Sequence, residues 1–218
     1  MKRSIFCFVF LFSAGLLSAQ LFQPGIKGGL NMARLTNMGS GSITIGGSGS
    51  TVSSKSVLGP HGGVYARINL SEKVYFMPEI LYSYEGYKTS SETTTSGAVT
   101  ASSEFNQVLH YIRIPAIFHV NASENVSLGI GAFYGILLGA SYESYSNANG
   151  VESSDSGSNL DDLNTSDIGF AVNIGYNFDM GLNFGLRYFT GLSDIVDDSI
   201  GKHTSSVLQF YMGYHLSE

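Results

Sequence analysis

The stretch Ile168-Gly169-Phe170-Ala171-Val172-Asn173-Ile174-Gly175-Tyr176-Asn177-Phe178 decides the fold. Its even-numbered residues are all large and apolar, whereas its odd-numbered residues are glycine, alanine or asparagine. Successive side chains of a β-strand point to opposite faces, so this period of two predicts a strand that lies between two different environments. The same alternation runs through Leu182 to Tyr188 and through Leu208 to Leu216.

Five earlier segments repeat the pattern, each with its apolar set on the even-numbered positions: Ile26 to Met32, Val64 to Leu70, Val74 to Tyr84, Val108 to Val120 and Val126 to Tyr142. The last segment also carries Gly131, Gly135 and Gly139, a spacing found in packed transmembrane helices. The 13 residues from Leu128 to Ala140 are too few for a spanning helix, which needs roughly 20 residues. We therefore favour a strand with these glycines on a crowded inner face, which brings the predicted strands to eight.

The connections between these strands alternate strictly between long and short. Long linkers rich in Ser, Thr, Gly and Asp cover about 38–57, 89–103, 146–166 and 193–205, and the short ones cover 71–73, 121–125 and 179–180. Short periplasmic turns and long outer loops are typical of transmembrane β-barrels, which must close because a bilayer cannot satisfy a strand edge. The sequence predicts an all-β fold, an eight-stranded antiparallel up-and-down transmembrane β-barrel with both termini in the periplasm.

A soluble, lipocalin-like periplasmic barrel that binds a ligand is the alternative, because the period alone does not say which face points outward. Three features favour the membrane: small or charged residues suit a tight lumen, tyrosines cluster near the strand ends, and few charges fall on the apolar face.

Composition and the N-terminus indicate an exported protein. The 218 residues include 27 Gly, 4 Pro, 14 Phe and 13 Tyr, which excludes a largely disordered chain, and a net charge of −6 argues against a nucleic-acid partner. A basic start at Lys2 and Arg3, an apolar stretch from Ile5 to Leu17 and small residues before Gln20 predict a signal peptide over 1–19, with the barrel domain over 20–218. Removal of this segment would take two of the 11 basic residues and the only cysteine, so we expect no disulfide in the mature chain.

Three segments of this barrel pattern resemble the PorT-type outer-membrane β-barrel proteins of the Bacteroidota: Pro24 to Asn31 (PGIKGGLN), Leu109 to Ala116 (LHYIRIPA) and Arg187 to Ile195 (RYFTGLSDI). The resemblance covers essentially the whole mature chain. It implies a barrel in the bacterial outer membrane after Sec-dependent export, and the family's namesake is linked to protein secretion across that membrane. The C-terminus departs from many such barrels, because it ends on Leu216-Ser217-Glu218 rather than on an aromatic residue.

Charged residues on the odd-numbered, inward face predict a structural charge network in the lumen. Its members are Lys27, Arg67, Glu79, Glu85, Arg113 and Arg187. Because Arg67, Glu79 and Arg113 lie on consecutive strands, we expect the acid to sit between the two bases. A gate or ion path is the alternative to a plug formed by paired charges, and the plug is favoured because an eight-stranded barrel is filled by its own side chains.

Two other constellations could carry chemistry. His110 near Ser102 or Ser103 is the best candidate for a nucleophile and base of a lipid-modifying enzyme, although serine is abundant enough to produce such proximity by chance. The acidic residues of the last two long linkers could chelate Ca²⁺, but none follows the spacing of a Ca²⁺ loop, and a solvated acidic surface is the simpler interpretation. These residues are Glu152, Asp155, Asp161, Asp162, Asp167, Asp194, Asp197 and Asp198.

We therefore expect a small, non-enzymatic barrel with a structural or surface-interaction role, no open pore, and no catalytic, cofactor or metal site. An accessory role in secretion or transport is the second hypothesis, and an outer-membrane enzyme the third. The expected partners are outer-membrane lipid and periplasmic or secretion-machinery proteins, with no nucleic acid, and the barrel is expected to be monomeric.

Overall fold

The computed structural model describes residues 22–36, 41–45, 48–96, 98–158, 160, 163–196 and 202–216. The ten strands are β1 Phe22–Leu35, β2 Gly41–Ile45, β3 Ser48–Asn69, β4 Val74–Thr95, β5 Ala98–Asn121, β6 Val126–Ala148, β7 Val151–Gly157, β8 Ser166–Asn177, β9 Leu182–Gly191 and β10 Ser205–His215. No helix in this described part of the chain is long and apolar enough to cross a membrane. The predicted signal peptide lies outside the described residues.

Eight of the strands close into a ring in the order β1-β10-β9-β8-β6-β5-β4-β3, because β1 pairs with both β10 and β3. Every neighbouring pair in the ring is antiparallel. The turns at 70–73, 122–125 and 178–181 are short and lie at one end of the barrel, here called the short-turn end. The eight-stranded, up-and-down barrel predicted from the alternation is confirmed.

The apolar face of the barrel points outward. Ile168, Phe170 and Val172 of β8 are 50–53% exposed, whereas the intervening Ala171 is 1% exposed. Most even-numbered apolar residues of the other ring strands are likewise exposed or half-buried, so the surface is apolar where a soluble barrel is polar. This arrangement fits a lipid environment and contradicts the lipocalin-like alternative, in which the apolar set would line the inside.

Two glycines of β6, Gly129 and Gly135, make room for large side chains in the lumen. A Cβ on Gly129 would lie 2.7 Å from the His119 ring, and one on Gly135 would lie 3.0 Å from an Arg113 nitrogen. The even–odd rule ends at Leu138, because the β5–β6 register shifts between His110 and Tyr111. Beyond this bulge Ala140 is buried, although the alternation placed it on the apolar outer face.

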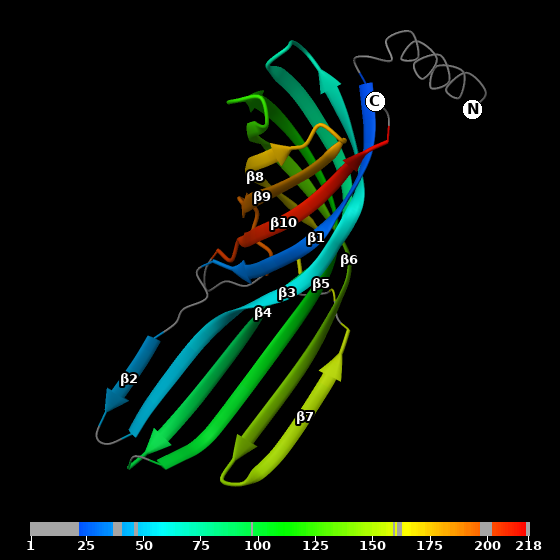
Figure 1. Ribbon diagram of the computed structural model, residues 1–218. Coiled ribbons are helices and arrows are strands. Elements are labelled where there is room, and N and C mark those ends of the chain that lie inside the picture. Colours follow the sequence, from blue (N-terminus) through cyan, green and yellow to red (C-terminus); the bar gives the residue numbers. More distant parts are fainter. Residues whose placement is uncertain are drawn as a thin grey trace, which may run out of the picture.

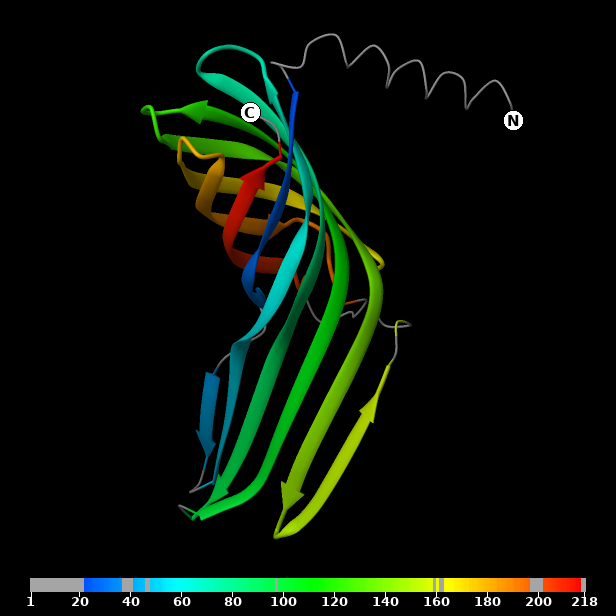
Figure 2. The same cartoon turned by 45° about the vertical axis from the view of Figure 1, so that its right-hand side comes forward.

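The long polar linkers are the main correction to the sequence analysis, because much of them forms strands. β3 to β6 have 22, 22, 24 and 23 residues, and β2 and β7 add an outer strand on either side. The strand residues beyond the ring form a six-stranded antiparallel sheet, here called the protruding sheet. Its strands cover 41–45, 48–56, 87–95, 98–107, 142–148 and 151–157. Figures 1 and 2 show it as a long curved sheet that leaves the barrel on the side opposite the short turns.

Local chemistry explains why these polar segments are strands. The β6–β7 connection is Asn149-Gly150 with φ of 51° and 84°, the pair of left-handed conformations that a two-residue hairpin requires. Bulges in β3, between Ser56 and His61, and in β6 at Leu138, opposite the His110–Tyr111 step of β5, fall where the sheet leaves the ring. Bulges increase the bend and twist of a strand.

Candidate functional site: the closed lumen and the protruding sheet

A first charge cluster crosses the middle of the lumen. Arg187 of β9 makes two parallel hydrogen bonds to Glu79 of β4, at 2.8 Å and 2.6 Å, and Lys27 of β1 donates to the same carboxylate at 2.7 Å. All three side chains are 0% exposed. Paired, bidentate geometry of this kind is what offsets the desolvation of buried charges.

A second cluster lies nearer the protruding sheet. Arg113 of β5 donates to both oxygens of Glu85, at 2.8 Å and 2.6 Å, and to Asp167 of β8 at 2.6 Å. Asp167 also accepts a hydrogen bond of 2.5 Å from the Ser205 hydroxyl of β10. This cluster ties four strands of the ring together across the lumen.

The structure corrects the predicted pairing in this network. Five of the six residues named for the lumen, Lys27, Glu79, Glu85, Arg113 and Arg187, are buried and ion-paired. Arg67, in contrast, is only partly buried, stacks over the Tyr75 ring and donates to Asn69, so Glu79 does not lie between Arg67 and Arg113. Glu79 instead pairs with Lys27 of β1 and Arg187 of β9, which lie on strands that are not its neighbours, whereas Arg113 pairs with Glu85 of the neighbouring strand β4.

An apolar lid covers the lumen at the end next to the protruding sheet. Ile195, from the connection between β9 and β10, is 0% exposed and packs in one cluster with Leu35, Tyr87, Leu109, Tyr111, Leu137 and Ala140. A bridge between Leu163 and Val196 joins two long connections above it. The cavity between this lid and Glu85 measures about 10 Å³, which is the space of about one water molecule.

The structure does not bring the candidate base His110 together with Ser102 or Ser103, because all three lie on one strand, β5. His110 lies on the outer wall of the barrel, where its Nδ1 is 2.6 Å from the Tyr82 hydroxyl. Ser103 is on the same strand seven residues away, a distance of about 23 Å along a β-strand, and its hydroxyl bonds to Ser91. Proximity in sequence misleads here because strand β5 continues straight through the predicted loop.

The acidic residues of the last two linkers form no cation site in the described part of the chain. No three His, Cys, Asp or Glu side chains are grouped there in a way that could hold a metal ion. Asp167 belongs to the lumen. Asp155 accepts a hydrogen bond from Tyr142, Asp194 accepts one from the His203 backbone, and Glu152 accepts one from Asn147. The remaining predicted ligands, Asp161, Asp162, Asp197 and Asp198, lie outside the described residues.

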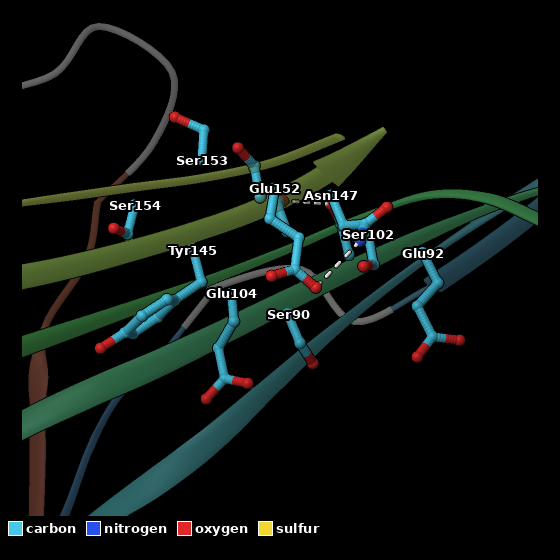
Figure 3. A pocket seen from close by; sticks show the side chains of 12 residues that line it. Ser90, Glu92, Ser102, Glu104, Tyr145, Asn147, Glu152, Ser153 and Ser154 are labelled. Atoms are coloured by element: carbon cyan, nitrogen blue, oxygen red, sulfur yellow. Dashed lines mark hydrogen bonds between the residues drawn. The ribbon is translucent and has the colours of Figure 1, made fainter. Parts of the chain in front are cut away.

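The outer face of the protruding sheet carries a shallow polar depression of about 510 Å³. Glu92, Ser102, Asn147 and Glu152 form a row across β4, β5, β6 and β7, and Ser90, Glu104, Tyr145 and Ser154 form the next row on the same face. Figure 3 shows these side chains, with the Asn147–Glu152 hydrogen bond. The Lys88 ammonium pairs with Glu104 and holds the pKa of that carboxyl below its usual range, and the Asp155 carboxylate raises the pKa of Tyr142.

The geometry is thus that of a closed, outward-apolar barrel, and the family comparison agrees: residues 18–197 match the outer membrane protein beta-barrel domain. The chain belongs to this family. It is therefore a small β-barrel of the bacterial outer membrane. The family description is broader than the PorT-type resemblance, and both that finer assignment and the Bacteroidota source stay predictions.

Solved structures of the same general kind are similar to the chain only at a distance. Ail, the attachment invasion locus protein of Yersinia pestis, is 12% identical over 89% of this chain and 98% of its own, with a TM-score of 0.44. Neisserial surface protein A is 13% identical over 88% and 96%, with a TM-score of 0.40, and OprG of Pseudomonas aeruginosa is 10% identical over 91% and 97%, with a TM-score of 0.37. No curated protein matches the chain.

Proposed function

We propose that this outer-membrane barrel is a non-conducting anchor that displays its protruding sheet at the cell surface as an interaction surface. The observation that carries the proposal is strand length. A tilted strand crosses a bilayer with about 9–11 residues, whereas β3 to β6 have 22–24. The surplus residues are paired into one continuous sheet rather than left as separate loops.

The orientation follows from the turns. Outer-membrane barrels carry their short turns on the periplasmic side, so the opposite end, with the protruding sheet, faces the outside of the cell. The face of this sheet is rich in Ser, Thr and Glu, and the outer edges of β2 and β7 pair with no other described strand. Such edges offer main-chain donors and acceptors to an extended segment of a partner protein.

Two barriers in the lumen support the non-conducting part of the proposal. The ion-paired clusters fill its middle, and the Ile195 lid covers the end beyond them. Planar-bilayer recordings of the refolded barrel are expected to show no stable channel, and a large, stable conductance would refute this part.

The surface-interaction role is tested by placing a photo-crosslinking residue at Ser154, in the polar depression, in living cells. A matched control carries it at Ser71, in a short turn at the other end. The proposal expects crosslinks to extracellular protein from Ser154 and none from Ser71, together with cleavage of the protruding sheet by protease added to intact cells. Protection of the sheet in intact cells would reverse the orientation and overturn the proposal.

The remaining partner hypotheses stay predictions. An accessory role in secretion predicts periplasmic crosslinks from Ser71, and a deletion phenotype in secretion would favour it. The expectations of a monomer, of no enzymatic activity and of no nucleic-acid partner likewise stay predictions.

A further inference from the structure

Three basic side chains lie just beyond the apolar band of the barrel, on the side that faces lipid. Arg34 of β1 follows Met32, which is 45% exposed, by two residues, and Lys55 of β3 lies three residues from Leu58, which is 63% exposed. Both basic side chains are exposed. The polar headgroup layer on each side of a bilayer begins where the hydrocarbon ends and is about 5–7 Å deep, so these residues stand at its height.

Lys88 of β4 joins them on the neighbouring strand. It lies directly opposite Lys55 in the β3–β4 ladder. Like charges in opposite positions destabilise a strand pair unless something of opposite charge neutralises them. Glu104 pairs with Lys88, and that ion pair is solvent-exposed, with side chains 37% and 47% exposed.

Arg34 and Lys55 form no ion pair of their own. Among the residues that the structure describes, no ion pair includes Arg34 or Lys55, and Glu104 is left to face both lysines. The cluster thus keeps an excess of positive charge in a chain whose acidic residues outnumber its Lys and Arg by 17 to 11.

The distribution of charge across the outer face is uneven in the same sense. Glu143 and Glu152 lie on β6 and β7, and Glu92 lies four residues beyond Lys88 on β4, whereas Arg34, Lys55 and Lys88 lie on β1, β3 and β4 where these strands leave the ring. The bases therefore gather on three adjacent strands at one height, where the sheet leaves the membrane.

We propose that Arg34, Lys55 and Lys88 form a binding surface for the phosphate-bearing headgroups of outer-leaflet lipids. Phosphate oxygens accept hydrogen bonds from guanidinium and ammonium groups and neutralise the like-charged Lys55–Lys88 pair. Such contacts fix the base of the protruding sheet on the membrane surface and so set the direction in which the sheet projects. The inference rests on the orientation argued above but not on any partner of the sheet itself.

The test uses the full protein, purified from membranes in detergent, and measures binding of bisphosphorylated lipid A by native mass spectrometry. The double variant Lys55→Gln/Lys88→Gln removes the paired charges, and Lys73→Gln, in the turn at the opposite end, is the matched control. A basic residue near an anionic surface contributes enough for the double variant to lose about 10- to 30-fold in apparent affinity. The control is expected to bind as the unaltered protein does.

Further arms separate lipid recognition from other causes. Dephosphorylated lipid A should bind the unaltered protein and the double variant equally, and inorganic phosphate at the lipid's concentration should not compete. A heat-dependent mobility shift on gels confirms that each variant is a folded barrel. Equal binding of bisphosphorylated lipid by the double variant and the control, or full competition by inorganic phosphate, would overturn the proposal.

Discussion

The substitution Glu79→Gln should destabilise the barrel strongly, because it removes the one acid that neutralises two buried bases. Arg187 and Lys27 together make three charge-assisted hydrogen bonds to Glu79, of 2.6–2.8 Å, and the three side chains are 0% exposed. Glutamine keeps one acceptor oxygen but no charge, and the Arg187 guanidinium cannot lose its proton. Breaking a buried pair in this way costs about 3–5 kcal/mol.

The free energy of unfolding is measured by guanidinium titration of the barrel in detergent, with tyrosine fluorescence and the gel mobility shift as two readouts. Glu92→Gln, on the exposed face of the protruding sheet, is the matched control and should change the free energy by less than about 0.5 kcal/mol. Lys27→Met should fall between the two, since Glu79 keeps both bonds from Arg187. If Glu79→Gln unfolds at the same denaturant concentration as Glu92→Gln, the lumen network does not hold the barrel together.

Three further predictions concern other parts of the molecule. Asp167→Asn removes one of the buried carboxylates around Arg113 but leaves the other, so the same titration should show a smaller loss of about 1–3 kcal/mol, and no loss would contradict the pairing. Glu104 should titrate below the ordinary range of glutamate by carbon NMR, and Lys88→Gln should move its pKa up into that range; an unchanged value would exclude the ion pair. Replacing Asn149 and Gly150 by alanine forces alanine into left-handed conformations, so hydrogen exchange of β7 should speed up while the gel shift is unchanged.

The barrel could be predicted from the sequence because two solvents act on its strands. One face of each strand contacts lipid and the other a packed lumen, so every second residue is large and apolar, as in Ile168 to Phe178. In the structure these even-numbered side chains are the exposed ones. The closed ring follows from the same contrast, because a bilayer cannot satisfy a strand edge. The short turns came from the linker lengths, and the outward direction of the apolar face from the small and charged residues opposite it. The parity breaks at the β5–β6 bulge, where no local residue pattern predicts it, and also at Gly86 and Ser206, even-numbered residues that are buried.

The protruding sheet could not be predicted in this way, because both of its faces are polar. Beyond the ring, β4 and β5 carry Ser, Thr and Glu on both faces, so no hydrophobic period distinguishes these strands from loops. Threonine favours strands, so the three consecutive threonines at 93–95 are a weak indication of a strand in this segment. Asn149-Gly150 is a stronger indication of strands here, since an Asn-Gly dipeptide is typical of a two-residue hairpin.

The lumen network was predictable in membership but not in pairing. Parity along a strand places a charge on the inner face, and it would have placed Asp167 there too, had the strand been extended one residue before Ile168. Which acid meets which base depends instead on the height of each residue across the barrel, and this is set by the stagger of strands far apart in sequence. Arg67 fails to reach Glu79 for that reason and stacks on Tyr75 instead.

The two parts of the molecule are built to be changed independently. The barrel is held by clusters around Glu79 and Arg113 inside the ring, whereas the far part of the protruding sheet is held by its own ladders and by the Asn149-Gly150 hairpin. The two parts meet at the Ile195 lid, where Tyr87 of the sheet packs in the same cluster. Substitutions without shared contacts add in free energy, so a change at the tip of the sheet should leave the effect of Glu79→Gln unaltered. A surface that can vary without unfolding its membrane anchor is what a role in surface interaction requires, and a transport role through the lumen would need the opposite arrangement.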